Sequence, residues 1–531
     1  MMLNQSRLCH LTTLVAIATF AVVLCARRAA ARQVEPLRLN ADQPQLFIDD
    51  YLIDEKQGLK RTLHQPDDVP ANPVILPEHP WEHRRIPYGS VWYDAELGKF
   101  RCWYLTLNIY DSRPGFRGYR KQHHVPIHEA AYLCYAESED GIRWRKPELG
   151  LHEFRSSKNN NILLTCLGTH FDSTSVMHTP HDRERPWKMI SFIGLWPYKQ
   201  DLIKQQWGDT KFGITQAGHY GWSSKDGIHW QPMNDGRPVL RASDRSMFWW
   251  DSKQALYVGA AKSSLNRKRA QLYATSPDAI NWTRTTDWIH TADERDHPGD
   301  EAEAAYGFRY GDQYVGFCEM RRVRRGAPVT INWELMTSRD GRNWKRPIRE
   351  LFFADGPEQS WRHQVFKIFA SPPIERDGKL WIYYGGKTGT VSVEEGTEPF
   401  QALCVATMRK DGFVSLDADE SGGHLVTKPL VAVGKQLRLN VAVHDGGHAK
   451  VALLDEDGTP LPGFDLANSR AITSDGLDQL VSWSSGSDIS KLAGQTVRLR
   501  IDLSDARLYA LEFRKVPSPL DGGRASSGAT P

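Results

Sequence analysis

The sequence predicts an all-β protein, a five-bladed β-propeller followed by a small β-sandwich domain. The first observation is a strand-turn-strand unit in residues 132–144, where the turn Ser138-Glu139-Asp140-Gly141 is followed by Trp144. Asp-Gly between two β-prone runs favours a hairpin, because glycine adopts positive φ without steric cost. The unit recurs in four more segments, the last of which lacks the tryptophan: residues 219–230, 271–282, 333–344 and 404–416.

A second unit lies upstream of each Asp turn and consists of two further strands joined by a short turn. Its copies occupy residues 90–104, 175–192, 247–260, 304–317 and 369–384. Together the two units give four strands per repeat, which is the composition of a propeller blade. Five copies within residues 85–420 therefore predict five blades.

The turn aspartates have a structural interpretation of their own. We expect them to form the turns, and the tryptophans that follow to pack between sheets. The four aspartates concerned are Asp140, Asp226, Asp278 and Asp340.

The remaining segments complete the domain organisation. Residues 1–31 read as an export signal, with Arg7 before an apolar run and Ala29-Ala30-Ala31 as a cleavage site, which predicts a secreted or periplasmic protein without stable membrane insertion. Residues 45–84 form an N-terminal strand and connector, and the strand is expected to clasp the main domain. Residues 424–514 alternate like the strands of a β-sandwich, and residues 515–531 form a disordered tail.

Composition excludes some classes of function. The net charge of +3 with 25% charged residues is an ordinary soluble balance, too weakly basic to indicate nucleic-acid binding. The 18 tryptophans suit β-sheet packing, and any that remain in a cleft suit stacking on sugars. Cys102 and Cys134 lie on neighbouring predicted strands and could pair, although the odd number of cysteines in the mature chain argues against a disulfide framework.

Candidate catalytic residues lie where the first strand of each blade begins, because these positions face the mouth of a propeller's central channel. Carboxylates from three blades converge there, and glycosyl transfer needs one protonated and one ionised carboxyl group. The predicted acid, base and pKa-tuning groups, in an order left open, are Asp172, Asp244, Glu301 and Glu303. The residues predicted to hold the sugar are Tyr88, Arg245, Trp249 and His363.

Structural roles compete with each of these assignments. Asp172 and Asp244 could cap strand ends, Glu301 and Glu303 could belong to a solvated acidic loop, and His363 could be a packed or solvated histidine. An arginine cluster comprises Arg321, Arg322, Arg324 and Arg325; it would suit an anionic sugar, although a solvated loop is the favoured interpretation. No metal site or cofactor is predicted from the loose spacing of His123, His124 and His128, although a structural calcium in the channel is left open.

The Ser-x-Asp-Gly-x-x-Trp turns, the export signal and the trailing β-sandwich resemble the five-bladed β-propeller glycosidase-like superfamily. That superfamily includes arabinanase/xylosidase-like and fructosidase/levansucrase-like enzymes and the related mannoside phosphorylases. Residues 46–53, 159–164 and 450–464 are more closely similar to a group of secreted bacterial propeller proteins with a C-terminal β-sandwich. The resemblance implies a propeller fold and glycoside hydrolase activity.

The sequence departs from this family at its catalytic motifs. Blade 1 begins Ile86-Pro87-Tyr88-Gly89-Ser90, without the carboxylate that fructosidases carry there. The Arg-Asp-Pro motif is approached only around Asp172 and Asp244. Glu319 follows Cys318, the reverse of the family's Glu-Cys signature, so no catalytic role is carried over to it.

The favoured function is a secreted carbohydrate-active protein, a glycoside hydrolase acting on a poly- or oligosaccharide through channel-facing carboxylates. The alternative is a non-catalytic glycan-binding propeller, which the missing carboxylate in blade 1 favours. A third interpretation, a sialidase-like or lyase enzyme, depends on the arginine cluster. The sequence leaves the glycan, the type of bond and the oligomeric state open.

Overall fold

The computed structural model describes residues 35–82, 85–107, 131–165, 170–194, 216–327, 329–363, 367–388 and 401–515. The predicted export signal, the three loop histidines and the predicted tail beyond residue 515 lie outside these ranges. Within them the structure is all-β, with short 3-10 turns at η1 (Pro80–Glu82), η4 (Asn234–Gly236) and η5 (Ser490–Leu492). No helix in the described part of the chain is long and apolar enough to span a membrane.

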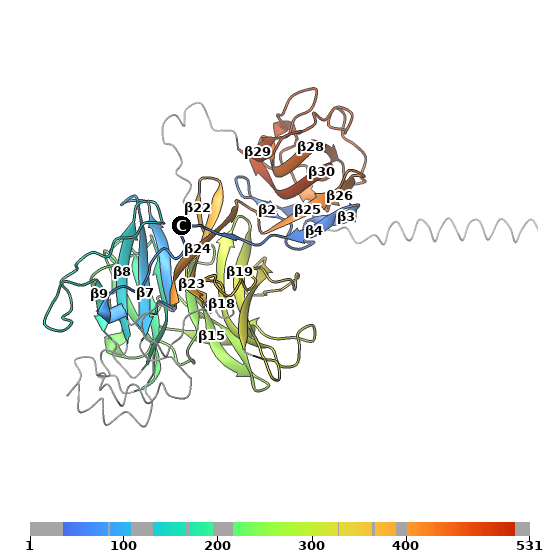
Figure 1. Ribbon diagram of the computed structural model, residues 1–531. Helices are drawn as coiled ribbons and strands as arrows, with labels where there is room; N and C mark the ends of the chain where they lie inside the picture. Colours follow the sequence, from blue (N-terminus) through green and yellow to red (C-terminus); the bar gives the residue numbers. More distant parts are fainter. Residues whose placement is uncertain are drawn as a thin grey trace, which may run out of the picture.

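Five separate sheets form the propeller and confirm the predicted number of blades (Figure 1). Blade 1 contains β6 (Tyr88–Asp94), β7 (Lys99–Leu107), β8 (Ala131–Ser138) and β9 (Ile162–Thr165). Blade 2 contains β10 (His170–His178), β11 (Trp187–Gly194), β12 (Gly218–Ser224) and β13 (Trp230–Pro232). Blade 3 contains β14 (Met247–Asp251), β15 (Leu256–Leu265), β16 (Lys268–Ser276) and β17 (Thr283–His290). Blade 4 contains β18 (Glu301–Tyr310), β19 (Gln313–Arg322) and β20 (Thr330–Ser338).

Blade 5 is completed by the chain that precedes blade 1. Its own strands are β21 (Lys367–Ile368), β22 (Ile374–Arg376), β23 (Lys379–Lys387) and β24 (Gln401–Arg409), and β5 (Asp67–Asp68) pairs antiparallel with β24. The Tyr384 hydroxyl donates to Asp68 Oδ1 at 2.7 Å, and Asn72 Nδ2 donates to the Val405 carbonyl at 2.8 Å. The ring is therefore closed by strands from opposite ends of the propeller sequence.

The Asp turns have the predicted internal structure. In blade 1 the Ser138 hydroxyl oxygen accepts the Gly141 N–H at 2.9 Å, and Asp140 Oδ1 accepts the N–H groups of Ile142 and Arg143. Gly141 has φ of 78°, which favours glycine. The same hydrogen bonds to the aspartate recur at Asp226, Asp278 and Asp340, so these four residues form turns as predicted.

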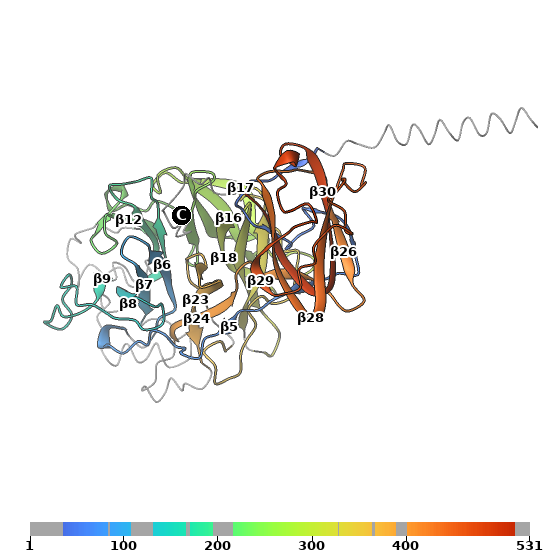
Figure 2. The ribbon, with the colours of Figure 1, turned by 90° about the horizontal axis from the view of Figure 1, so that it is seen from above.

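A further sheet beside the propeller is built from both ends of the chain (Figures 1 and 2). Its C-terminal strands are β25 (Val414–Ala418), β26 (Gly423–Thr427), β27 (Leu430–Val431), β28 (Gln436–Leu454), β29 (Gly476–Leu480) and β30 (Thr496–Arg514). Its N-terminal strands are β1 (Leu37–Arg38), β2 (Gln45–Leu46), β3 (Ile53–Gln57) and β4 (Lys60–Leu63). The β1–β27 pair is parallel and the other pairs are antiparallel, so the sheet is mixed.

The N-terminal strand joins the two bodies of the protein. Its backbone pairs with β30, while Leu46 and Ile48 lie in the core of the propeller and Phe47 lies in the core of the C-terminal domain. Alternate residues of an extended chain point in opposite directions, so one short segment contributes to both cores. Gln45 Nε2 also donates to Asp312 Oδ2 of blade 4 at 2.8 Å. The backbone partner of this strand is the C-terminal sheet, and its contact with the propeller is made by side chains.

The cysteines of the described residues are not paired. Cys102, Cys134, Cys318 and Cys404 are all free and buried. Cys102 faces Ala136 across β7 and β8, and Cys134 faces Tyr104, so the two side chains belong to different positions of the ladder. The pairing that was considered for Cys102 and Cys134 is therefore not formed.

Candidate active site

A buried ion pair lies at the centre of the group of charged side chains that gathers where the blades meet. The Arg245 guanidinium, just before β14, pairs with both carboxylate oxygens of Glu319 on β19, with Nε to Oε2 at 3.2 Å. Glu319 also accepts the Ile368 N–H at 2.8 Å, and its Oε2 lies 3.7 Å from Lys367 Nζ. The pair therefore links blades 3, 4 and 5.

Blade 1 joins this group through an aromatic ring. The Arg245 guanidinium carbon lies 4.7 Å from the centroid of the Tyr88 ring, a cation–π contact. Burial, reinforced by the Asp172 carboxylate, raises the pKa of Tyr88 well above its ordinary value, so its hydroxyl remains protonated. Arg245 is 3% exposed and its ion pair with Glu319 links the blades, while its predicted role in holding the sugar stays a prediction.

Asp172 and Asp244 occupy equivalent positions in blades 2 and 3. The Ser173 hydroxyl donates to Asp172 Oδ1, and the Ser173 oxygen accepts the backbone N–H of Arg245 at 3.0 Å. Ser173 and Arg245, the residues that directly follow the two aspartates, have φ of 51° and 60°. Positive φ at a residue other than glycine is strained, and such strain gathers at functional sites.

Lys262 connects Asp244 to blade 4. Its ammonium lies 2.8 Å from Asp244 Oδ1 and 3.8 Å from Glu303 Oε1, and Arg269 forms a second ion pair with Glu303. Burial alone would raise the pKa of Glu303, but Lys367, Lys262 and Arg269 outweigh burial and lower the pKa to about 2. Glu303 is therefore ionised across the neutral range.

These residues are called the axial cluster below: Tyr88, Asp172, Asp244, Arg245, Lys262, Arg269, Glu303, Glu319 and Lys367. The exposed fraction of the side chains decreases along the axial cluster from Asp244 to Glu319. The side chain of Asp244 is 36% exposed, whereas Glu319 is completely buried. A ligand in solution therefore reaches the cluster from the side of Asp244 and Arg269.

Glu301 lies at the rim of the axial cluster. Its Oε2 accepts Arg321 Nη1 at 2.7 Å and lies 3.6 Å from Arg269 Nε. Two neighbours in the predicted arginine cluster are similarly engaged, because Arg322 and Arg324 both pair with the buried carboxylate of Asp300. The cluster therefore stabilises the start of β18, and three of its four arginines already have carboxylate partners.

Trp249 and His363 are not members of the axial cluster. Trp249 is buried between blades 3 and 4, with ring centroids 5.6 Å from Tyr306 and 6.4 Å from Trp344. It is therefore a packing residue, which corrects its assignment to the substrate. His363 donates its backbone N–H to the Lys387 carbonyl at 3.1 Å, beside blade 5.

Sequence reasoning missed several members of the axial cluster. Lys262 lies within β15, Glu319 lies within β19 and was given no role, and Lys367 begins the two-residue strand β21, just before the strand predicted to begin at residue 369. His219 was also missed. Burial lowers the pKa of His219 to about 4, and neither ring nitrogen has a hydrogen-bond partner among the described residues.

Metal binding does not fit this arrangement. Asp244, Glu303 and Glu319 each lie against a lysine or arginine, whereas calcium is held by oxygen ligands without competing cations. No group of three or more metal-binding side chains occurs among the described residues. The channel calcium left open by the sequence therefore has no suitable set of ligands in the axial cluster.

Comparisons with known proteins describe similar architectures. No protein-family model matches the chain, and no curated protein matches it significantly. Among solved structures, a protein described as a glycoside hydrolase aligns with 66% of this chain and 93% of its own at 14% identity and a TM-score of 0.42. A Schwanniomyces occidentalis fructofuranosidase complexed with fructosylnystose aligns with 86% and 100% at 10% identity and a TM-score of 0.39. An F. plautii N-acetylgalactosamine deacetylase in complex with a blood group B trisaccharide aligns with 67% and 97% at 15% identity and a TM-score of 0.40.

The chain has the five-bladed β-propeller fold of the glycosidase-like proteins that its sequence resembles. This assignment rests on its own strand order, in which five sheets surround the axial cluster. At such identities and TM-scores, the solved structures add no argument about its chemistry.

Proposed function

We propose that the protein is a glycoside hydrolase acting on a poly- or oligosaccharide at the axial cluster. The observation that carries this proposal is the gathering of Asp172, Asp244 and Glu303 from three neighbouring blades in unlike surroundings. Hydrolysis of a glycosidic bond needs carboxyl groups in two protonation states on either side of the bond. Environments that differ between carboxyl groups separate their pKa values and so provide both states.

The surroundings suggest roles for these three residues. Glu303 is held ionised by three cations and suits the carboxylate that faces positive charge developing on the sugar ring. Asp172 is buried and accepts a hydrogen bond from the Ser173 hydroxyl, and we assign it the role of proton donor to the leaving oxygen. Asp244, at the exposed end beside Lys262, suits a base that activates water.

Single amide substitutions test this proposal. Asp172→Asn, Asp244→Asn and Glu303→Gln should each lower turnover by roughly 10²–10⁴-fold, the usual contribution of a positioned acid or base. Asp312→Asn in the β18–β19 turn serves as a control, because this carboxylate contacts Asn40 and Gln45 instead of the axial cluster. Turnover at the parental level in all three variants would exclude the assignment.

A glycan-binding protein without catalysis is the second candidate. The observation that favours it is the buried ion pair between Arg245 and Glu319. This pair commits the Glu319 carboxylate of the axial cluster to a structural contact instead of catalysis. Glycan binding that survives the three amide changes, with no hydrolysis by the parent protein, would support this candidate.

Export is part of the same proposal, and its support is the signal-like segment at residues 1–31. Expression of the full chain in a bacterial host should give a mature protein whose N-terminal sequence begins after Ala31. An intact N-terminus on protein recovered from the cytoplasm would contradict export.

A further inference from the structure

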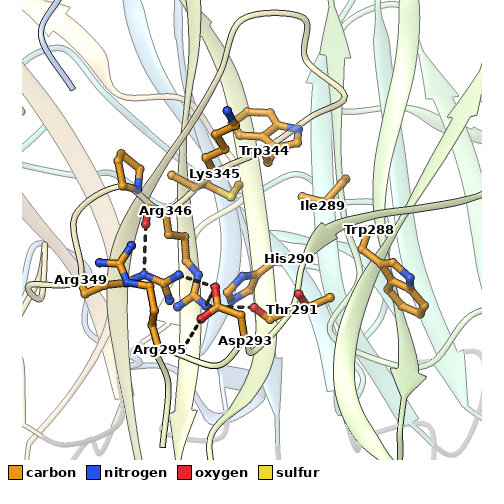
Figure 3. Close-up of a pocket in the computed structure, with 12 residues that line it drawn as sticks. Trp288, Ile289, His290, Thr291, Asp293, Arg295, Trp344, Lys345, Arg346 and Arg349 are labelled. Atoms are coloured by element: carbon orange, nitrogen blue, oxygen red, sulfur yellow. Dashed lines mark hydrogen bonds and ion pairs between the residues drawn. The ribbon is translucent and has the colours of Figure 1, made fainter. Parts of the chain in front are cut away.

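A cavity of about 390 Å³ lies between blades 3 and 4, apart from the axial cluster (Figure 3). It is formed by the end of β17, the connection that follows β17, and the segment after β20. Its volume falls within the range of roughly 300–1,000 Å³ that is usual for small-molecule sites. Ile289, Met336 and Trp344 give it an apolar side, and the remaining lining is mostly polar. A surface that is apolar on one side and polar on the other suits a sugar ring.

His290 provides an unsatisfied polar group in this lining. The residue is 3% exposed, and its Nε2 has no hydrogen-bond partner among the described residues. Burial, together with the Arg346 guanidinium, lowers the pKa of His290 well below its ordinary value, so the imidazole is neutral. A buried nitrogen without a partner costs free energy, which a ligand hydroxyl would recover whether Nε2 donates or accepts.

Two arginines form a fixed wall beside His290. Arg346 Nη1 donates to Glu334 Oε2 at 2.8 Å, and Arg346 Nη2 donates to the Thr291 carbonyl at 3.0 Å. Arg349 donates from Nη1 to Asp296 Oδ1 at 3.2 Å and also pairs with Asp293. Because their donors are engaged by acidic residues and backbone, these arginines shape the cavity and are not available to neutralise a ligand.

Two other cations in the lining are available. The guanidinium of Arg295 and the ammonium of Lys345 are exposed, and neither has a side-chain partner in the described part of the chain. Figure 3 shows Arg295 near Asp293 and Arg349, and Lys345 beside Trp344. An anionic group entering the cavity would therefore meet unpaired positive charge at its rim.

The cavity is connected to the axial cluster by a chain of ion pairs. Glu334 pairs with both Arg346 and Arg322, and Arg322 pairs in turn with Asp300. Asp300 directly precedes Glu301 at the start of β18.

We propose that this cavity is a second carbohydrate subsite, which binds a uronic acid unit of an acidic glycan. A sugar hydroxyl hydrogen-bonds to His290 Nε2, and the sugar carboxylate faces Arg295 and Lys345. The C–H face of the ring lies against Trp344. This inference rests on the proposed function, because it assumes that the protein acts on a carbohydrate. It adds the substrate class, which is an acidic polysaccharide.

Saturation-transfer NMR with the full mature chain tests the subsite. The probes are methyl β-D-glucuronide and methyl β-D-glucoside, and the protein carries Glu303→Gln so that binding is observed without turnover. The glucuronide should bind at least tenfold more tightly than the glucoside. His290→Leu should abolish glucuronide binding, and Arg295→Ala with Lys345→Ala should reduce the preference for the glucuronide to near unity. His229→Leu and Lys225→Ala, on the exposed Asp turn of blade 2, are the matched controls and should have no effect.

Equal binding of the two glycosides, no binding of either, or unchanged binding in the His290 variant would overturn the subsite. If His290→Leu fails to fold, the two exposed variants Arg295→Ala and Lys345→Ala decide the question by themselves. The outcome is separate from hydrolysis. Glucuronide binding without turnover in the parent protein refutes the glycosidase alone, and hydrolysis of neutral glycans without glucuronide binding refutes the subsite alone.

Discussion

Side chains of opposite charge hold the axial cluster together, and the ionisation state of the Glu303 carboxyl group is an example. Its carboxyl group lies among Lys262, Arg269 and Lys367, and these cations hold its pKa at about 2 despite burial. The same group in an unfolded chain titrates near about 4.3. Folding therefore favours the ionised form of Glu303.

This difference gives the stability of the protein a predictable pH dependence. A carboxyl group whose pKa is lowered by folding stabilises the native state above its unfolded pKa, and the stabilisation is lost as the pH falls from about 5 towards 2. Glu303→Gln should therefore lower the free energy of unfolding at pH 7 by on the order of 3 kcal/mol and by progressively less below pH 5. Urea denaturation at pH 7, 5 and 3 measures the change, and the exposed Glu96→Gln serves as the control. A difference from the parent that is constant across this range would contradict the linkage.

Among single residues, the sequence pointed to those members of the axial cluster that lie at the start of the first strand of a blade. Asp172, Asp244 and Glu303 lie near the starts of first strands in neighbouring blades, and their predicted catalytic roles stay predictions. Lys262 was not predicted and Glu319 was given no role, because both lie within the second strand of a blade and their approach to the axis is visible only once the ring has closed. Trp249 was predicted to hold the sugar, whereas its side chain packs against Tyr306 and Trp344 between blades 3 and 4.

The Asp turn is the element that connects neighbouring blades. The Tyr383 hydroxyl of blade 5 donates to the Gly141 carbonyl at 2.9 Å in the turn of blade 1. Trp103 Nε1 of blade 1 donates to the Gly227 carbonyl at 2.7 Å in the turn of blade 2. Gln254 Nε2 of blade 3 donates to the Asp340 carbonyl at 3.3 Å in the turn of blade 4. Each of these turns therefore docks on the blade that precedes it.

Glycine in this turn is required both by its backbone and by the neighbouring blade. Gly227 has φ of 74°, and a Cβ there would lie 2.8 Å from Trp103 Cζ2. Gly227→Ala should destabilise the protein by roughly 2–4 kcal/mol, from positive φ together with overpacking. Gly98→Ala isolates the effect of positive φ, because Gly98 has φ of 65° and no atom lies within 4 Å of the added Cβ.

Urea denaturation of the two glycine variants separates the effects. The Gly98 variant should lose about 1–2 kcal/mol, and the Gly227 variant clearly more. Equal losses would show that the turn does not depend on close packing against blade 1.

Most elements were predictable because their signals are local. An Asp-Gly pair specifies its own turn, and the alternation of a strand is visible within a few residues. The closure of blade 5 was not predictable, since β5 is two residues long and pairs with Ala406 and Thr407, more than 300 positions away. Nothing in Asp67 or Asp68 specifies that partner.

At the scale of the whole molecule, a polar junction joins the propeller to the C-terminal sheet. The Tyr310 hydroxyl at the end of β18 donates to Asp411 Oδ1 at 2.6 Å. Asn440 Nδ2 on β28 donates to Asp411 Oδ2 at 2.9 Å. Burial raises the pKa of Asp411, so this carboxyl group depends on both hydrogen bonds.

Removing one hydroxyl should weaken this junction. Tyr310→Phe leaves a buried carboxyl group with one partner fewer and should cost about 1–3 kcal/mol. Tyr306→Phe on the same strand is the control, because no hydrogen bond of its hydroxyl occurs among the described residues, and it should have little effect. Differential scanning calorimetry should show the propeller and the C-terminal domain separating into two transitions in the Tyr310 variant only. A single unshifted transition would show that the junction contributes nothing to coupling.

The sequence predicts a propeller over residues 85–420 and a separate domain over residues 424–514, whereas β25 (Val414–Ala418) already pairs with β30 of the C-terminal sheet. The placement of the first strands was not visible in the sequence. Leu46 and Phe47 read as one apolar strand, and only the folded arrangement shows that they serve two different cores. The N-terminal and C-terminal segments are therefore one structural unit.

Release of reducing ends from polysaccharides tests the central claim most directly. The purified mature protein, its Asp244→Asn variant and its Glu303→Gln variant are incubated with neutral, uronic and sulfated polysaccharides. We expect the parent protein to release reducing ends, most readily from a uronic polymer, and both variants to be nearly inactive. Binding to a glycan without release by the parent protein from any polymer would contradict the claim and identify the propeller as a binding protein.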